Sequence, residues 1–313
     1  MKRLALVVAD SDRGERLDRF IARAGAVSRG LARKAIEAGG VYLDGKRTKI
    51  ASRPVYPGQA ISVVLEQPAR AEQTRAAVST GPLEILFEDQ HLLAVVKPAF
   101  VPAQATLAGD SGALTTSVAA HLGLTSASEV GLVHRLDRET SGLTLFGKTD
   151  AATAALAEAF RSGTVRKRYL AVAAGPLPSE GVIEAWLAKD PSRPGQFRPA
   201  AEGSGVPATT RFRSLTPPAA ATLCELFPET GRTHQIRVHL LSLGAPILGD
   251  TRYGGPSEVV VGDQRVIAER VLLHAAGVEL NHPITGAPLA LRAPAPPDLR
   301  AAALALGAPP EAF

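Results

Sequence analysis

The stretch Gly131–Leu143 constrains the fold more than any other, because two short apolar runs enclose a cluster of charged and polar side chains. The flanking runs have the length of strands, and the residues between them are typical of a loop. In this loop Asp137 lies between Arg135 and Arg138, and nearby cations favour the charged form of a carboxylate. Such a group can act as nucleophile or proton shuttle, whereas the plainer alternative is a salt bridge to a neighbouring arginine.

The loop also resembles a known signature. His134-Arg135-Leu136-Asp137, followed by Thr140-Ser141-Gly142, is similar to the signature of the RluA-type pseudouridine synthases. This resemblance implies that Asp137 is the one indispensable catalytic residue. It extends over about residues 83–296 through further motifs in the same order, which are Lys167–Val172, Thr230–Leu240, Gly249–Gly255, Leu273–Ala275 and His282–Gly286.

Tyr169 lies in a predicted strand at residues 165–173. The alternation of a strand places Tyr169 on one face with Val165 and Ala171, which is typical of a core aromatic. The resemblance implies instead that Tyr169 stacks on the target base. Stacking of an aromatic ring on a base is worth about 1–3 kcal/mol.

A second group of cations lies at the start of a predicted helix. Thr233 is expected to cap this helix, and Arg232 and His234 lie beside the cap. The stripe that the helix would bury is Ile236, Leu240 and Leu243. Helix N-termini attract phosphates and carboxylates, so Arg232 and His234 are candidate RNA-binding residues, although cations at such a site are equally typical of a solvated surface. The resemblance implies that Arg237 pairs with Asp137.

The basic residues are concentrated near the N-terminus. Residues 13–53 contain eleven Lys or Arg and four Asp or Glu, a balance of +7 in a chain of net charge +5, so residues 54–313 carry −2. The pattern predicts a helix at 16–24, a second helix capped by Ser28, and a hairpin that turns at Asp44-Gly45. Such a basic segment favours contacts with backbone phosphates over a merely solvated face.

The N-terminal segment is similar to the alpha-L RNA-binding module over roughly residues 13–66. The resemblance implies that the module binds structured RNA and has no catalytic role. Its candidate RNA-binding residues are Arg16, Arg19, Arg29, Arg33, Lys34 and Lys46.

Four parts are therefore predicted along the chain. The module at 13–66 precedes a linker at 67–80, which lacks a hydrophobic period, and a catalytic domain at 81–296 precedes a loose Ala/Pro-rich tail at 297–313. The resemblance implies an α+β fold. The catalytic domain would have a mixed, largely antiparallel sheet with a central cleft, and the N-terminal part would be a small α/β RNA-binding domain.

Composition excludes several other classes of protein. Hydrophobic residues make up 45% of the chain and charged residues 21%, as in a globular protein, and no apolar stretch is long enough to span a membrane. The run Leu4–Ala9 is too short for the core of a signal peptide. The single Cys224 permits neither an internal disulfide nor a cysteine-rich zinc site. We expect a monomeric cytoplasmic protein that needs no metal and no other cofactor.

Three classes of function compete on these residues. A catalytically silent RNA-binding protein needs only the basic module. A metal-dependent hydrolase would use His134, Asp137, His234, His239 and Asp250. The hydrolase has the least support, because His234 and His239 lie about 140° apart around a helix and no metal-binding motif is present. Asp137, Tyr169 and Arg237 at their motif positions favour the third class, an RNA pseudouridine synthase.

Isomerisation of uridine requires that the base leave its stack, because the reacting atoms are inaccessible within a helix. The resemblance implies that Asp137 is the covalent or acid–base catalyst and that Arg237 keeps it ionised and oriented. Arg135 would fill the gap left by the flipped nucleotide. The N-terminal module favours ribosomal RNA over transfer RNA as the structured RNA that is modified.

Two positions depart from the family pattern. Phe100 stands where the family has a glycine, and Gln104 stands where it has a histidine. We expect these departures to affect substrate contacts more than catalysis.

Overall fold

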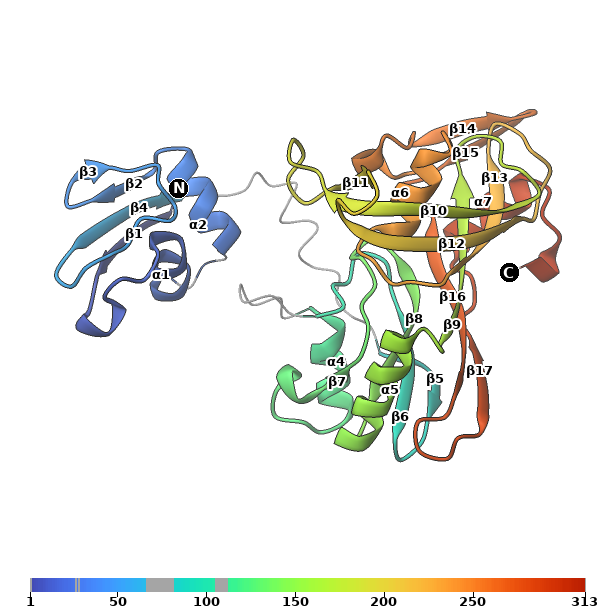
Figure 1. Ribbon diagram of the computed structural model, residues 1–313, viewed down its shortest axis with the longest axis horizontal. Coiled ribbons are helices and arrows are strands. Elements are labelled where there is room, and N and C mark those ends of the chain that lie inside the picture. The colour runs from blue at the N-terminus through green and yellow to red at the C-terminus, as the bar shows by residue number, and fades with distance from the viewer. Residues whose placement is uncertain (1, 26, 28, 66–81, 105–111, 313) are drawn as a thin grey trace. The chain divides into compact units, whose positions relative to one another are not determined.

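The structure is a computed structural model that describes residues 2–25, 27, 29–65, 82–104 and 112–312. The described residues form two compact units, one that contains residues 2–65 and one that contains residues 82–103 and 117–312 (Figure 1). The predicted linker at 67–80 lies outside the described residues.

The first unit combines two helices with a four-stranded antiparallel sheet. The strands follow the order β1 (Lys2–Val7), β4 (Ala60–Leu65), β2 (Val41–Leu43) and β3 (Lys46–Arg47). Helices α1 (Leu17–Ala24) and α2 (Arg29–Glu37) supply Phe20 and Ile36 to its core. The predicted turn is confirmed, because Asp44 and Gly45 both have the positive φ angles that a two-residue hairpin loop requires. The predicted cap Ser28 lies outside the described residues.

Strand β1 lies before the predicted start of the module at residue 13, and it pairs with β4, so the sheet of the first unit includes residues that precede the predicted module. Residues 2–7 pair with residues 60–65 in unbroken antiparallel register. Leu4 and Leu6 pack against the core of the first unit, whereas Val7 is exposed, as the alternation of a strand requires. The partner of β1 follows more than fifty residues later in the chain, and no local sequence pattern predicts such a pairing.

The second unit is built on an eleven-stranded sheet. Its main path is β11-β10-β12-β13-β9-β16-β8-β6-β5, with β17 beside β16 and β7 beside β8. The bounds are β5 (Glu84–Glu88), β6 (Leu92–Lys97), β7 (Gly131–Leu132), β8 (Ser141–Gly147), β9 (Arg166–Ala173), β10 (Glu180–Lys189), β11 (Phe197–Ala200), β12 (Val206–Ser214), β13 (Thr222–Pro228), β16 (Leu273–Asn281) and β17 (Pro288–Arg292). Strands β8 and β16 are parallel, and the other pairings in the described sheet are antiparallel. The predicted α+β class with a mixed, largely antiparallel sheet is confirmed.

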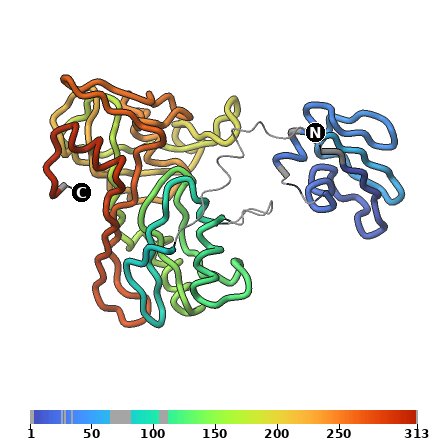
Figure 2. The backbone as a smooth tube through the Cα atoms, turned by 180° about the vertical axis from the view of Figure 1, so that it is seen from behind, coloured from blue at the N-terminus to red at the C-terminus, as the bar shows by residue number. Residues whose placement is uncertain are grey.

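Helices and one hairpin surround this sheet. The elements outside the two sheets are α4 (Leu114–His121), α5 (Asp150–Ser162), α6 (Gln235–Ser242), α7 (Pro297–Ala305), the hairpin β14 (Glu258–Val261) with β15 (Gln264–Ile267), and short 3-10 turns at Ala127–Glu129, Thr251–Tyr253 and Pro310–Ala312. A further 3-10 turn, at Asp10–Asp12, belongs to the first unit. Helix α5 contacts β7 and β8, α6 contacts β10 to β13, and α7 contacts β9 and β15. Figure 2 shows the same arrangement from behind, with the β16–β17 hairpin in orange and red. No described helix has the length and apolar character needed to cross a membrane.

Over the described residues 297–312, the chain does not form the loose tail that was predicted for 297–313. Helix α7 begins with Pro297, buries Leu299 and Ala303 completely, and is followed by the buried Leu306. These side chains join the same core cluster as Leu170 of β9. The prediction was wrong because the low sequence complexity concealed a short apolar stripe that becomes stable only by packing on the sheet.

Candidate active site

The loop at residues 133–140 connects β7 to β8, and its first half is anchored to β8. The His134 Nε2 atom accepts a hydrogen bond from the Leu145 N–H at 2.9 Å, and the ring stacks on Phe160 with centroids 4.4 Å apart. Burial, together with the charge of Lys167, lowers the pKa of His134 to about 4, so the neutral ring can accept this bond. His134 therefore supports the loop.

A buried lysine holds the second half of the loop. Lys97 at the end of β6 donates to the carbonyl oxygens of Pro98, Val101 and Arg138 at 2.9, 2.8 and 3.1 Å. Burial lowers the pKa of Lys97 to about 7, although the charge of Asp137 opposes the shift. Because the Arg138 carbonyl follows Asp137 directly, this contact restricts the backbone next to that carboxylate.

The backbone at Phe100 suits the glycine that the resemblance implies at this position. Phe100 has a φ of 67°, which is in the left-handed region that favours glycine. The Arg138 Nε–H donates to the Phe100 carbonyl at 2.9 Å, so this segment also contacts the loop. Gln104, the other departure from the family pattern, is exposed.

Arg270 connects the loop to helix α7. Its Nη1 lies 3.4 Å from the Glu139 carbonyl and 2.9 Å from the Val271 carbonyl. Its Nε and Nη2 donate to the two carboxylate oxygens of Asp298 at 2.6 and 2.8 Å. The C-terminal helix thereby takes part in fixing the position of the loop.

Gly142 allows β8 to approach β16 directly behind the loop. A side chain at Gly142 would place its Cβ 2.3 Å from the Ala275 carbonyl oxygen, and the φ of 119° excludes ordinary residues as well. Next to it, the Ser141 hydroxyl lies 2.9 Å from Nδ1 of the fully buried His274. The glycine of the signature is therefore required by the parallel pairing of the strands.

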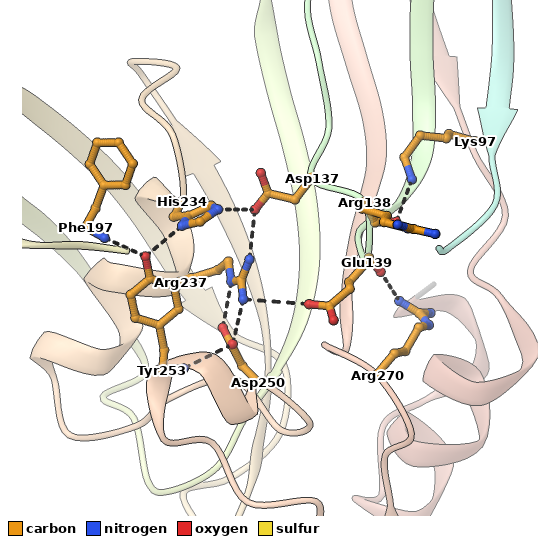
Figure 3. Close-up of polar contacts among 10 residues, drawn as sticks. All are labelled: Lys97, Asp137, Arg138, Glu139, Phe197, His234, Arg237, Asp250, Tyr253 and Arg270. Atoms are coloured by element: carbon orange, nitrogen blue, oxygen red, sulfur yellow. Dashed lines mark hydrogen bonds and ion pairs between the residues drawn. The ribbon is translucent and has the colours of Figure 1, made fainter. Parts of the chain in front are cut away.

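Asp137 lies against an arginine that two other carboxylates also contact (Figure 3). The Arg237 Nη1 atom is 3.2 Å from Oδ2 of Asp137, while Nε and Nη2 donate to the two oxygens of Asp250, each at 2.7 Å. Glu139 is 3.8 Å from Nη2. Arg237 and Asp250 are almost inaccessible, whereas the side chain of Asp137 is 28% exposed.

The charges around Arg237 outweigh the cost of its burial. Burial by itself would lower the pKa of Arg237. Hydrogen bonds to Asp250 and the charges of Asp250 and Asp137 raise this pKa by more than burial lowers it, so the guanidinium stays charged. Oδ2 of Asp137 is thus held by a fixed cation. No hydrogen bond reaches its Oδ1 from the part of the chain that the structure describes.

A cavity of about 110 Å³ lies over Asp137. The residues that line it include six that the sequence selected, which are Arg135, Asp137, Tyr169, Arg232, His234 and Arg237. Burial, and then the charge of Asp137, raise the pKa of Tyr169, which keeps its hydroxyl neutral. Lys167, on the same strand, also lines the cavity and donates to the Thr230 carbonyl at 2.9 Å.

Helix α6 begins differently from the prediction. Its N-cap is His234, which has a φ of 57°, and no side chain caps the helix, so the role predicted for Thr233 was wrong. Leu243 lies beyond the helix and is 42% exposed, because the chain turns away at the C-cap. His234 instead points its ring at Tyr253, with Nδ1 2.7 Å from that hydroxyl and Nε2 3.8 Å from Oδ2 of Asp137.

The cations at the rim of the cavity differ in accessibility. Arg135 is exposed, and Arg232 is also exposed while its Nε–H donates to the Pro207 carbonyl at 3.1 Å. Both can therefore meet a phosphate without leaving the cavity rim. His234 is only 9% exposed, so it is poorly placed for the same task.

The histidines of the metal-dependent alternative have other partners. His239 bonds Thr210 at 2.9 Å in the core, and His134 supports the loop. Within the described ranges no three His, Cys, Asp or Glu side chains are grouped so that they could hold a metal ion.

The basic residues of the first unit are only partly described. Arg19, Arg33 and Lys46 have exposed side chains. Arg16 pairs with the buried Asp18 at 3.1 Å. The side chains of Arg29 and Lys34 lie outside the described part of the structure. RNA binding by these residues stays a prediction.

Sequence reasoning missed several residues that build the site. Asp250 and Tyr253 lie in the Gly249–Gly255 motif, to which the resemblance assigned no role. The motif itself was the sequence signal for these two residues, because it places an acid and an aromatic residue between glycines. In the structure these residues form the turn that contacts Arg237. Phe197, whose N–H donates to the Tyr253 hydroxyl at 2.9 Å, had no signal in the sequence.

Comparison with known proteins adds independent support. Residues 91–242 match the family described as RNA pseudouridylate synthase, and residues 15–61 match the S4 domain. A Nitrosomonas europaea protein named ribosomal large subunit pseudouridine synthase D is 36% identical over 301 residues, which cover 95% of this chain and 86% of that protein. A protein of the same name from Xanthomonas campestris pv. campestris is 35% identical over 302 residues, 94% of this chain and 89% of that protein.

A solved structure is similar as well. Human RNA Pseudouridylate Synthase Domain Containing 4 superposes with a TM-score of 0.58 at 25% identity, covering 76% of this chain and 97% of that chain. The family match, at residues 91–242, includes the loop that carries Asp137.

Proposed function

Because this chain belongs to the RNA pseudouridylate synthase family, and is therefore an RNA pseudouridine synthase with an S4 domain, we propose that it modifies large-subunit ribosomal RNA. Two relatives that align with more than nine-tenths of the chain are named for that RNA. The +7 balance within residues 13–53 supports contacts with a large structured RNA. We expect the enzyme to act as a monomer in the cytoplasm.

Asp137 is the proposed catalytic residue. The observation that carries this proposal is a carboxylate with one oxygen held by Arg237 and the other without a hydrogen bond from any described residue, in the wall of a cavity that Tyr169 shares. Isomerisation breaks the bond between uracil N1 and the ribose, turns the base, and joins C5 to the same ribose carbon; C5 then loses its proton and N1 gains one. The unbonded Oδ1 is the atom that would act on the nucleoside, as nucleophile or as proton acceptor.

The surrounding residues have supporting roles in this proposal. The neutral ring of Tyr169 provides a stacking surface for a base that has left the helix. Arg237 orients Asp137 and stabilises its negative charge, and Asp250 orients Arg237. Arg135, Arg232 and Lys167 at the cavity supply positive charge for the phosphates on either side of the flipped nucleotide.

The proposal is tested with Asp137→Asn, which keeps the size of the side chain and removes its charge. We expect this variant to bind ribosomal RNA fragments with the affinity of the unaltered protein and to form no pseudouridine. Substantial turnover by Asp137→Asn would exclude Asp137 as the catalyst.

The RNA itself is identified by mapping pseudouridines in a strain that lacks the gene and in the same strain with the gene restored. Sites that disappear and return in large-subunit ribosomal RNA are the expected result. Sites confined to transfer RNA would show that the substrate was assigned wrongly.

A further inference from the structure

His234 has an unusual backbone for a residue at the start of a helix. Its φ of 57° lies in the left-handed region, where a side chain with a Cβ is strained. Strain of this kind persists where the surroundings impose it, and it occurs frequently at functional sites. The conformation turns the imidazole toward the cavity, and its side chain is 9% exposed. A contact with an RNA phosphate would require a more accessible ring.

A chain of hydrogen bonds determines which ring nitrogen carries the proton. The Phe197 N–H donates to the Tyr253 oxygen at 2.9 Å, and this oxygen lies 2.7 Å from Nδ1 of His234. A buried tyrosine hydroxyl needs an acceptor, and Nδ1 is its acceptor among the described residues. Tyr253 therefore donates to Nδ1. The neutral imidazole then has its own proton on Nε2.

The proton on Nε2 faces the proposed catalytic carboxylate. Nε2 is 3.8 Å from Oδ2 of Asp137, the same oxygen that Arg237 contacts at 3.2 Å. This distance is too long for a hydrogen bond, but bonds of catalytic groups are often long without substrate and shorten when substrate binds. A modest movement of Asp137 would place two donors on Oδ2 and leave Oδ1 for the reaction.

The charges around the ring favour its neutral form. Burial lowers the pKa of His234, and so do the cations Arg237 and Arg252, whereas Asp137 and Asp250 act in the opposite direction. Tyr253 contributes a neutral donor, because burial raises the pKa of its phenol. These groups come from the loop, from α6 and from the turn after Gly249, while Phe197 of β11, which carries no charge, packs against the same ring with centroids 5.7 Å apart.

We propose that His234 is a positioning residue for Asp137: its Nε2–H donates to Oδ2 in the substrate complex and keeps Oδ1 directed at the nucleoside. This inference rests on the proposed function of Asp137. It replaces the earlier interpretation of His234 as an RNA contact. Tyr253 acts through His234 by keeping the proton on Nε2.

The experiment compares His234→Phe with His234→Gln. Phenylalanine keeps a flat ring beside Phe197 and Tyr253 but has no donor, whereas glutamine places an amide N–H near the position of Nε2. The readouts are the single-turnover rate at saturating RNA and the RNA dissociation constant over a range of salt concentrations. A hydrogen bond to a charged group predicts that His234→Phe reduces the rate about 10- to 100-fold. RNA affinity and its salt dependence should stay unchanged, and His234→Gln should recover most of the rate.

Tyr253→Phe tests the second step of the argument. It keeps the ring that Arg237 covers at 5.0 Å and removes only the hydroxyl. We expect a smaller loss of the single-turnover rate than with His234→Phe, because the Nε2–H form remains accessible but is no longer enforced. His239→Gln on the same helix is the matched control, since its ring bonds Thr210 in the core and does not line the cavity. Thermal unfolding of all variants verifies that they are folded.

Several outcomes would overturn the inference. Weaker RNA binding with a lower salt dependence and an unchanged saturating rate would make His234 a phosphate contact. Equal loss with Phe and Gln would show that a donated hydrogen bond is not the cause. If the unaltered protein forms no pseudouridine, the proposed function itself fails. If it is active, Asp137→Asn is inactive and the His234 variants react at the normal rate, only the inference about His234 fails.

Discussion

The guanidinium of Arg237 contacts three carboxylates, but only Asp137 among them lines the cavity. Asp250 accepts two of its hydrogen bonds at 2.7 Å and is itself buried. Asp250 therefore orients Arg237, and one edge of the guanidinium is left to contact Asp137. The bidentate geometry matters here, because a planar fork holds its direction and a single ammonium does not.

Arg237→Lys tests this geometry at constant charge. Lysine has one compact ammonium that cannot contact Asp250 and Asp137 in the same way, so we expect turnover at saturating RNA to fall at least about tenfold. RNA affinity should stay near that of the unaltered protein. Arg161→Lys, at an exposed arginine paired with Glu158, is the control and should leave both quantities unchanged. Equal losses of turnover and affinity for Arg237→Lys would make it an RNA contact.

Phe100 permits a test of backbone strain. At a φ of 67° alanine is strained and glycine is not, so Phe100→Gly should be more stable than Phe100→Ala by about 1 kcal/mol. Urea unfolding of the two variants measures the difference. Ala99, whose φ is not positive, is the control site, and Ala99→Gly should destabilise the protein there. A Phe100→Ala variant as stable as Phe100→Gly would contradict the positive φ.

At the scale of elements, the loop that carries Asp137 is supported from three directions. Lys97 at the end of β6, His134 against β8 and Arg270 in front of β16 each bond the loop or its neighbours. Through Asp298, Arg270 also links the loop to α7. These bonds hold the loop as rigidly as the sheet. Asp137 therefore keeps a fixed orientation, which a catalytic group requires.

Helix α7 is expected to contribute to stability as part of the core. Leu299 is completely buried, so Leu299→Ala should reduce the free energy of unfolding by about 2–5 kcal/mol. Leu304→Ala on the same helix removes an exposed side chain and should change it by less than about 0.5 kcal/mol. Denaturant titration of both variants gives the comparison. Equal stability of the two variants would contradict the view that α7 is part of the core.

At the scale of the whole molecule, the charge is divided unequally between the two units. The net positive charge lies in the first unit, where residues 13–53 carry a balance of +7, and the proposed catalytic residues all belong to the second. The RNA affinity that comes from phosphate contacts depends steeply on salt concentration, whereas the rate at which a bound nucleoside is isomerised depends on the residues of the cavity. Binding and chemistry should therefore respond separately to substitution.

A triple variant with Arg19, Arg33 and Lys46 changed to Gln tests this separation. The exposed side chains at these positions would each lose one contact with an RNA phosphate. Each lost contact makes the slope of log affinity against log salt shallower by about 0.7–0.9. The single-turnover rate at saturating RNA should stay unchanged. The control changes the same number of charges at the exposed, ion-paired residues Arg161, Arg211 and Arg265. An unchanged slope in the first variant would show that the basic face is only solvated.

The sequence by itself determined the elements whose signals are local. The helix predicted at residues 16–24 forms at Leu17–Ala24, the Asp44-Gly45 turn was identified from its two residues, and the loop of Asp137 was placed between its strands. Such features depend on neighbours within one turn or one hairpin, so a short window of sequence contains their physical cause. The resemblance then added the pairing of Arg237 with Asp137, residues 100 positions apart.

Only the tertiary structure decided the contacts between distant segments. The backbone of His234, its bond to Tyr253 and the N–H of Phe197 beneath them come from three separate parts of the chain. The pairing of β1 and the packing of α7 likewise depend on partners far along the sequence. The order of strands in the sheet brings these groups together, and this order follows from the burial of the whole core. For that reason the sequence identified the carboxylate, whereas the structure identified the residues that hold it.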